Sequence, residues 1–136
     1  IATSAVSGII YLASDSLSCF WISFVSGFLI DLDHVLDYYL QEGVNFDVKR
    51  FFKICLECRL KHLSIILHSW ELLALLWFWI IWSNPGIFWV SFAIGASQHM
   101  FFELVFNRGR VKTHYFYFLS MRLVKGFRFS EFLHKR

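Results

Sequence analysis

Ionisable side chains recur at or just inside the ends of apolar stretches, in three clusters. Their members are Asp31, Asp33, His34 and Asp37, then His68 and Glu71, then His99 and Glu103. Burying an ionisable side chain inside an apolar stretch costs free energy, so such residues rarely lack a function. Carboxylate oxygens combined with imidazole suit zinc, manganese or iron better than calcium. The clusters therefore predict a divalent metal site, and zinc is the metal we expect first.

The first cluster has helical spacing. In a helix Asp33 and Asp37 are four residues apart, and His34 is three residues from both Asp31 and Asp37. Several of these groups could therefore converge on one cation. The alternative is a solvated helix end with ordinary acids, because acids are common at a membrane boundary.

The other two clusters lie inside predicted membrane helices. His68 and Glu71 would share one helix face about 8 to 12 Å inside their span. A carboxylate at that depth should pair with a cation or accept hydrogen bonds. The alternative is a His–Glu pair that only fastens two helices. His99 and Glu103, four residues apart, reach nearly the same level, and such a pair can present two ligands on one face.

The composition indicates a membrane protein. The chain has 136 residues, of which 57% are hydrophobic, 21% aromatic and only 17% charged. One small water-soluble core could not bury so much Phe, Trp, Leu and Ile. We therefore expect a single all-α domain, residues 1–136, whose solvent is lipid.

The apolar stretches predict a multi-pass transmembrane helical bundle of about four helices. The expected spans are residues 1–13, 17–36, 63–82 and 87–106, of which the last two have the length that crosses a bilayer. The turn at residues 83–86 is short enough to require an antiparallel hairpin. Residues 14–16 separate the first two helices, with a Ser/Asp cap opening the second. One long kinked helix is the alternative there.

The basic residues indicate an orientation. Every Lys and Arg falls within residues 49–61 or 108–136, and the short turns have none. The positive-inside rule makes both segments cytoplasmic, so we expect a bacterial inner (plasma) membrane protein with its site on the cytoplasmic side. The net charge of +3 then reflects a rim facing anionic lipid, and no nucleic acid is expected as a partner. Residues 46–61 and 115–133 mix basic and aromatic residues and predict interfacial amphipathic helices.

The C-x-x-C pair and the histidines outside the three clusters predict no chemistry. Cys55 and Cys58 form a lone C-x-x-C, without the second pair that a structural zinc site needs. His62, His114 and His134 lie among basic residues or near the end of the sequence. We expect these histidines to be exposed, structural or in contact with lipid headgroups.

The three clusters together resemble the integral-membrane metal-dependent hydrolase family. The resemblance rests on Asp31-Leu32-Asp33-His34 after an apolar helix, His68-Ser69-Trp70-Glu71, and Gly95-Ala96-Ser97-Gln98-His99 followed by Glu103. It implies a small multi-helix membrane protein with an Asp/His metal site and a hydrolase activity. Two features depart from the family pattern. Glu103 stands where members more often have Asp, and His62 and His68 are more widely spaced than the usual histidine pair.

The first functional hypothesis is an enzyme. A divalent metal would be held by Asp33, His34, His68 and His99, with Asp31 and Glu103 as further ligands or as the carboxylates of a second metal. The metal would activate a water molecule, and Glu71 or Asp37 would act as general base or orient that water. A membrane-level site favours a lipid phosphoester or another amphiphile as substrate.

The second hypothesis is a non-catalytic metal-binding subunit, either in a homo-oligomer or with a membrane-protein partner. Two further functions are disfavoured. An ion transporter needs polar groups near the bilayer midplane, and the outer halves of these helices are apolar. A di-iron oxidase would be expected to show denser histidine clusters.

Overall fold

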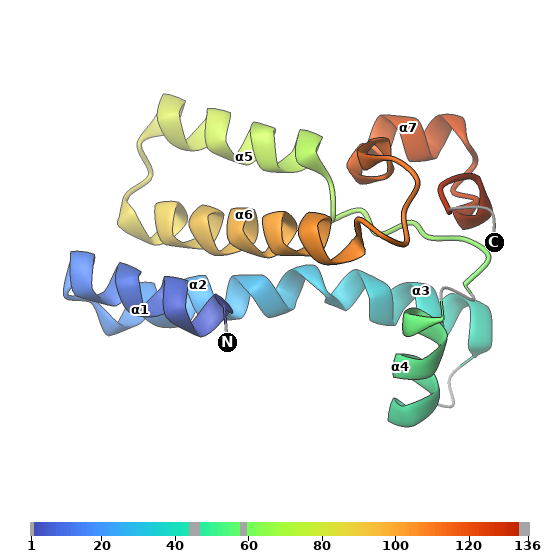
Figure 1. Ribbon diagram of the computed structural model, residues 1–136. Coiled ribbons are helices and arrows are strands. Elements are labelled where there is room, and N and C mark those ends of the chain that lie inside the picture. Colours follow the sequence, from blue (N-terminus) through green and yellow to red (C-terminus); the bar gives the residue numbers. More distant parts are fainter. Residues whose placement is uncertain (1, 44–46, 58–59, 134–136) are drawn as a thin grey trace. The chain divides into compact units, whose positions relative to one another are not determined.

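The computed structural model describes residues 2–43, 47–57 and 60–133, and every named element in these ranges is a helix. The prediction of an all-α fold is thereby confirmed. The elements are α1 (Ala2–Ser14), α2 (Leu17–Ile30), α3 (Leu32–Glu42), α4 (Val48–Leu56), α5 (Trp70–Ser83), α6 (Ile87–Asn107), the 3₁₀ helix η1 (His114–Tyr117), α7 (Leu119–Val124) and the 3₁₀ helix η2 (Phe129–Glu131) (Figure 1).

The chain divides into two compact units. Unit 1 combines Ile1–Ile30 with Trp70–Phe106, and unit 2 combines Asp31–Ser69 with Asn107–Arg136. That they act as a single domain stays a prediction.

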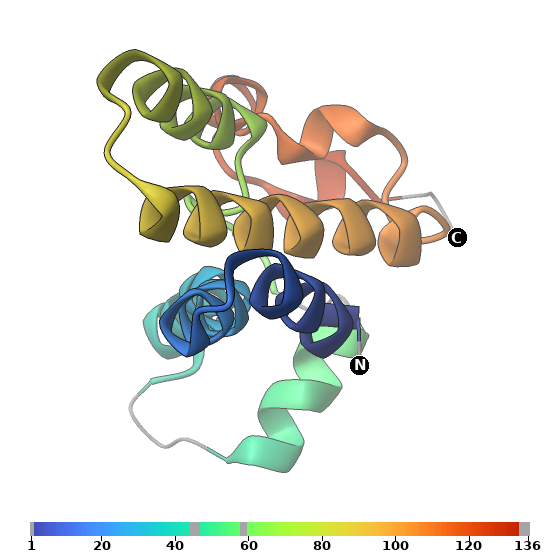
Figure 2. The same ribbon diagram turned by 90° about the vertical axis from the view of Figure 1, so that its left-hand side faces the viewer.

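Unit 1 contains two antiparallel helical hairpins, α1–α2 and α5–α6 (Figures 1 and 2). The first turns at Asp15, whose φ is 48°, and the Ser16 hydroxyl accepts the backbone N–H of Cys19 at the start of α2. The second turns through Asn84 and Gly86, both with positive φ. Both predicted turns are confirmed, and the long kinked helix is excluded.

Small residues join the helices of unit 1. The Ser7 hydroxyl donates to that of Ser23 at 3.2 Å and links α1 to α2. A Cβ atom at Gly95 of α6 would overlap the Ser26 hydroxyl and the Ser23 carbonyl of α2. Close approach through small residues is typical of helix packing in membranes, where lipid provides no hydrophobic force between helices.

Large apolar side chains of α2 face outward, while two of its serines, Ser23 and Ser26, are buried. Trp21, Val25 and Phe28 are exposed, whereas Ser23 and Ser26 are fully buried. The spacing of the exposed residues places them along one helix face. A soluble helix has the opposite arrangement, so this surface is suited to lipid.

One described helical stretch is both long and apolar enough to cross a membrane. It runs over Leu17–Glu42, a length of 26 residues that includes α2 and α3. The apolar helices Thr3–Ser14 and Trp70–Ser83 are shorter than a span. A bundle of four membrane-spanning helices therefore stays a proposal.

The predicted span 63–82 is wrong in its first third, because α5 begins only at Trp70. Residues 61–69, which we call the 61–69 loop, are not helical. Ile65 has a φ of 24°, outside the right-handed helical region. His68 therefore precedes the helix, and the expectation that His68 and Glu71 share a helix face is also wrong.

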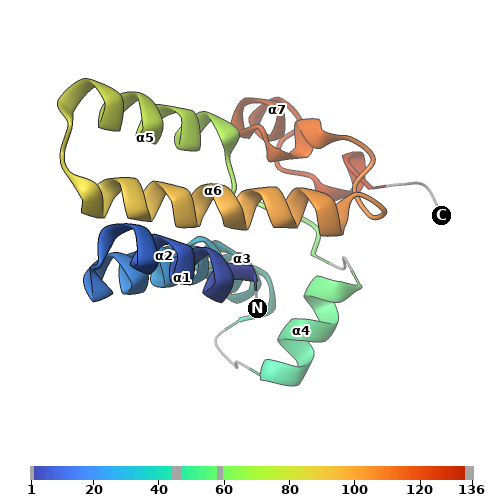
Figure 3. The ribbon, with the colours of Figure 1, turned by 60° about the vertical axis from the view of Figure 1, so that its left-hand side comes forward.

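The predicted interfacial helices are shorter or broken. Among the described residues of the range 46–61, Val48–Leu56 forms a helix, α4 (Figure 3). Asp47 caps its start, and the Asp47 carboxylate accepts two backbone N–H groups. Phe46, Cys58, Arg59 and His134 lie outside the described residues. Residues 115–133 form η1, α7 and η2 in place of one helix, because Gly126 and Phe127 turn the chain with positive φ. Phe116, which is buried, packs against Phe129 and Phe132.

Candidate metal centre

Polar residues along one face of α3 bind the backbone of the 61–69 loop. Asp33, Asp37 and Gln41 are spaced four apart, so their side chains share that face. Asp37 Oδ2 accepts the backbone N–H groups of Ser64 at 2.7 Å and Ile65 at 3.1 Å. Asp37 is only 2% exposed. The loop amides are therefore satisfied by α3 and do not need a helical turn of their own.

Gln41 extends this pairing to the beginning of the loop. Its Oε1 accepts the Lys61 N–H at 2.8 Å, and its Nε2 donates to the His62 carbonyl. His62 also forms an isolated antiparallel bridge with Arg128. The side chain of His62 is exposed, as expected from the sequence.

Arg122 of α7 binds the carbonyl groups of the same loop. Its guanidinium donates to Ser64 O at 2.9 Å, Ile65 O at 2.6 Å and His68 O at 2.9 Å. The side chain is fully buried and lies over the Phe116 ring, 5.7 Å from its centroid. Sequence reasoning missed this residue and counted it among the lipid-facing basic residues. Its apolar neighbours, Leu119 to Val124, were the available signal.

The imidazole of His68 is oriented by Asp33. Its Nδ1 lies 3.0 Å from Asp33 Oδ1 and 3.2 Å from Oδ2, and Oδ2 also accepts the Leu67 N–H at 2.9 Å. His68 is fully buried, and Asp33 is 7% exposed. Because a carboxylate can only accept, Nδ1 of the neutral ring carries the proton. The lone pair is then on Nε2. This is the carboxylate–histidine arrangement found behind many metal ligands.

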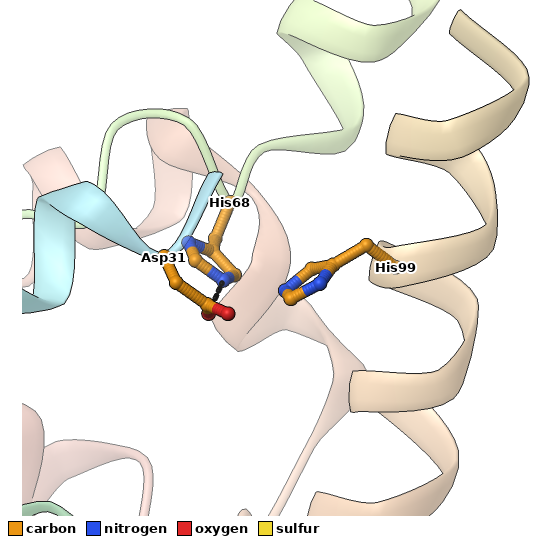
Figure 4. A group of neighbouring side chains, drawn as sticks. All are labelled: Asp31, His68 and His99. Carbon is orange, nitrogen blue, oxygen red and sulfur yellow. Dashed lines mark ion pairs between the residues drawn. The ribbon is translucent and has the colours of Figure 1, made fainter. Parts of the chain in front are cut away.

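Asp31 lies on the Nε2 side of His68. The distance from Nε2 to Asp31 Oδ1 is 3.7 Å, marked by the dashed line in Figure 4. Asp31 is the N-cap residue of α3, but its carboxylate makes no capping hydrogen bond. Zinc bonds at tetrahedral angles would separate two donor atoms by about 3.4 Å. The pair is therefore spaced more like two ligands of one ion than like a direct hydrogen bond.

His34 adds a second imidazole within unit 2. Its ring centroid lies 4.7 Å from that of His68. Asp33, His34 and His68 each offer a ligand atom, and these atoms lie within 4.8 Å of one another. Unit 2 thus brings together four of the six predicted metal-binding residues: Asp31, Asp33, His34 and His68.

The charges of the cluster favour a cation. Among the described residues, three carboxylates, those of Asp31, Asp33 and Asp37, contact His68 or its loop, set against the buried guanidinium of Arg122 and the exposed ammonium of Lys61 in the loop itself. With neutral histidines the cluster is formally negative. Burial weakens screening by water, so a bound cation would gain from this charge.

The remaining predicted residues belong to unit 1 or have another contact. Glu71 lies in the first turn of α5, and His99 and Glu103 lie on α6. Figure 4 also labels His99, whose ligation stays a prediction, as does that of Glu103. Asp37 uses Oδ2 to hold the loop, and its role as general base stays a prediction, like that of Glu71.

No protein-family model matches this chain, and no curated protein or solved structure matches it. The resemblance to integral-membrane metal-dependent hydrolases therefore stays a prediction.

Proposed function

We propose that this chain is a membrane-embedded, metal-dependent hydrolase. Asp31 and His68 would bind one divalent metal, Asp33 would orient His68, and His34, which groups with Asp33 and His68, is a proposed further ligand. The observation that carries the proposal is the contact of both His68 ring nitrogens with carboxylates, Nδ1 with Asp33 at 3.0 Å and Nε2 with Asp31 at 3.7 Å. Three protein ligands with an open fourth position are typical of catalytic zinc sites.

The proposed chemistry is attack by an activated water. A bound divalent metal lowers the pKa of a coordinated water toward neutrality and so supplies a nucleophile. Asp31, with a side chain that is 52% exposed, would leave room for water and substrate on that side of the cluster. Zinc is the metal we expect from the nitrogen and oxygen donors, with manganese and iron as alternatives. His99 and Glu103 are also proposed further ligands, and Glu71 is the proposed base.

The proposed substrate is a lipid phosphoester or another amphiphile. Ile66 and Leu67, which directly precede His68, are exposed apolar residues, and they could contact an acyl chain. The outward apolar face of α2 supports a location in the membrane. By the positive-inside rule, the site would lie on the cytoplasmic side of an inner membrane.

A non-catalytic metal-binding subunit is the second candidate. Asp33 and Asp37 also fasten the 61–69 loop, so a metal here could simply stabilise unit 2. A structural metal would raise stability without turnover, whereas a catalytic one would be needed for turnover in a protein that stays folded.

Metal content and turnover test the proposal together. Full-length protein purified in detergent should contain close to one equivalent of zinc, manganese or iron by mass spectrometry. H68A should lose the metal, and H114A should keep it, because His114 is an exposed histidine of the same unit. Fluorogenic phosphodiester, phosphomonoester and carboxylic ester lipids are then assayed before and after chelation. Metal-free wild-type protein that binds no added metal would disprove the site, and a metal-loaded protein inert on all three classes would favour the subunit.

A further inference from the structure

Arg122 is a buried cation outside the predicted set of metal-binding residues. It is the residue through which α7 reaches the loop that carries His68. Buried arginines are uncommon, because removing the charge from water is costly unless it is well hydrogen-bonded. Three carbonyl acceptors and the Phe116 ring offset that cost here.

His68 depends on this contact because it lies outside any helix. Its own N–H donates to Ile65 O at 3.1 Å in a turn, and its carbonyl accepts from Arg122 Nη2. Arg122 Nη1 holds the carbonyls of Ser64 and Ile65. Ile65 has positive φ, which a β-branched residue adopts only when its surroundings impose it. The guanidinium therefore helps to fix the backbone from which the His68 ring projects.

Asp33 and Arg122 fix different parts of the same residue. Asp33 contacts the imidazole, and Arg122 contacts the backbone carbonyl. With both contacts in place, the imidazole ring has little freedom to rotate or shift. Its Nε2 is therefore already in position to bind a metal. A metal ligand preorganised in this way binds more tightly than one that must first be ordered.

We propose that Arg122 is a positioning residue for the metal ligand His68. The inference rests on the proposed metal site. The planar guanidinium of arginine carries several N–H donors, so it can bind carbonyls of different residues at the same time. The ammonium of lysine is a compact group with fewer donors. Lysine should therefore reach some of the three carbonyls and restore part of the function, whereas methionine, of similar length but uncharged, should restore none.

Cobalt binding to the full chain in detergent tests this role, because Co²⁺ reports both affinity and ligand geometry by its visible absorption. We expect R122M to weaken Co²⁺ binding by roughly 10- to 100-fold, as changes to groups behind metal ligands usually do. R122K should fall between R122M and wild type. The matched control is R108M, which removes the same charge from an exposed position of unit 2. Circular dichroism of the metal-free proteins reports whether helix content is retained.

The outcomes separate the two proposals. Wild-type protein that binds no Co²⁺, or that binds no better than H68A, disproves the proposed metal site. Wild-type protein that exceeds H68A while R122M matches wild type in affinity and spectrum disproves only the role of Arg122. Loss of helix content in both R122M and R122K would also disprove it, because Arg122 would then hold the fold and not the ligand.

Discussion

Asp33 contacts both the imidazole of His68, at 3.0 Å, and the backbone N–H of the residue before it, at 2.9 Å. One buried carboxylate therefore fixes the ring and part of the loop that carries it. Its position in the first turn of α3 makes the carboxylate part of a rigid element, whereas His68 lies in a loop. The helix thus supplies the order that the loop would otherwise lack.

The substitution Asp33→Asn should weaken metal binding by roughly 10- to 100-fold without unfolding the chain. The amide oxygen can still accept the Leu67 N–H, but the carboxylate charge that favours the Nδ1–H tautomer is lost. Isothermal titration with Zn²⁺ measures the change. Asp15→Asn is the control, because Asp15 is an exposed acid in a turn of unit 1. Equal affinities for all three proteins would contradict the orienting role.

Asp37 should matter for stability more than for metal binding. Asp37→Ala removes the acceptor of two backbone N–H groups, and each buried donor left unsatisfied costs about 1–3 kcal/mol. Asp37→Asn keeps an oxygen acceptor and should lose less of the free energy of unfolding. Denaturant unfolding in detergent measures both. If Asp37→Asn keeps its stability but abolishes turnover, the sequence-based role of Asp37 as general base gains support instead.

The sequence predicted the composition of the unit 2 cluster but not the way its parts meet. Asp31, Asp33 and His34 were recognised because acids and a histidine follow an apolar helix at helical spacing. His68 was recognised too, but as a helical residue. Residues 63–69 are apolar enough to pass as the start of a span, and their non-helical form depends on Asp37 and Arg122. Such long-range contacts leave no local pattern.

Local chemistry explains which helices were predictable. Ser16 caps α2, and Pro85–Gly86 ends the α5–α6 connection, so both boundaries follow from neighbouring residues. The interruption of the helix expected over residues 115–133 is harder to predict from the sequence. Phe127 has a φ of 56°, unusual for a bulky residue. The N–H of Leu63 donates to its carbonyl, so the turn is tied to a segment 64 positions earlier.

The contact of α6 with α2 should tolerate no side chain at residue 95. In Gly95→Ala the new Cβ would overlap the Ser26 hydroxyl and the Ser23 carbonyl, and overpacking of this kind typically costs about 1–3 kcal/mol. Gly8→Ala is the matched control: nothing lies within 4 Å of a Cβ there, and alanine favours a helix by about 0.5–1 kcal/mol over glycine. The unfolding temperature should therefore fall for Gly95→Ala and rise slightly for Gly8→Ala. Equal shifts would mean that α6 does not pack on α2 through Gly95.

The outward apolar face of α2 should be a lipid surface. Phe28 is 60% exposed and lies near the middle of the 26-residue stretch Leu17–Glu42. A lysine near the centre of a membrane helix costs about 2.5–3.5 kcal/mol, so Phe28→Lys should lower the inserted population about 100-fold or more relative to the uninserted one. Ser18→Lys is the control, because residue 18 is close to the end of the stretch and a lysine there can extend to the interface.

Extraction of membranes with alkaline carbonate measures this difference. Wild type and Ser18→Lys should stay in the pellet, and Phe28→Lys should move to the supernatant or be degraded. A soluble helix with the same exposed position would respond in the opposite way, because lysine in place of an exposed phenylalanine improves solubility in water. If Phe28→Lys raises the yield of soluble, monomeric protein while wild type is also recovered without detergent, α2 does not cross a membrane, and the substrate proposed for the metal site loses its basis.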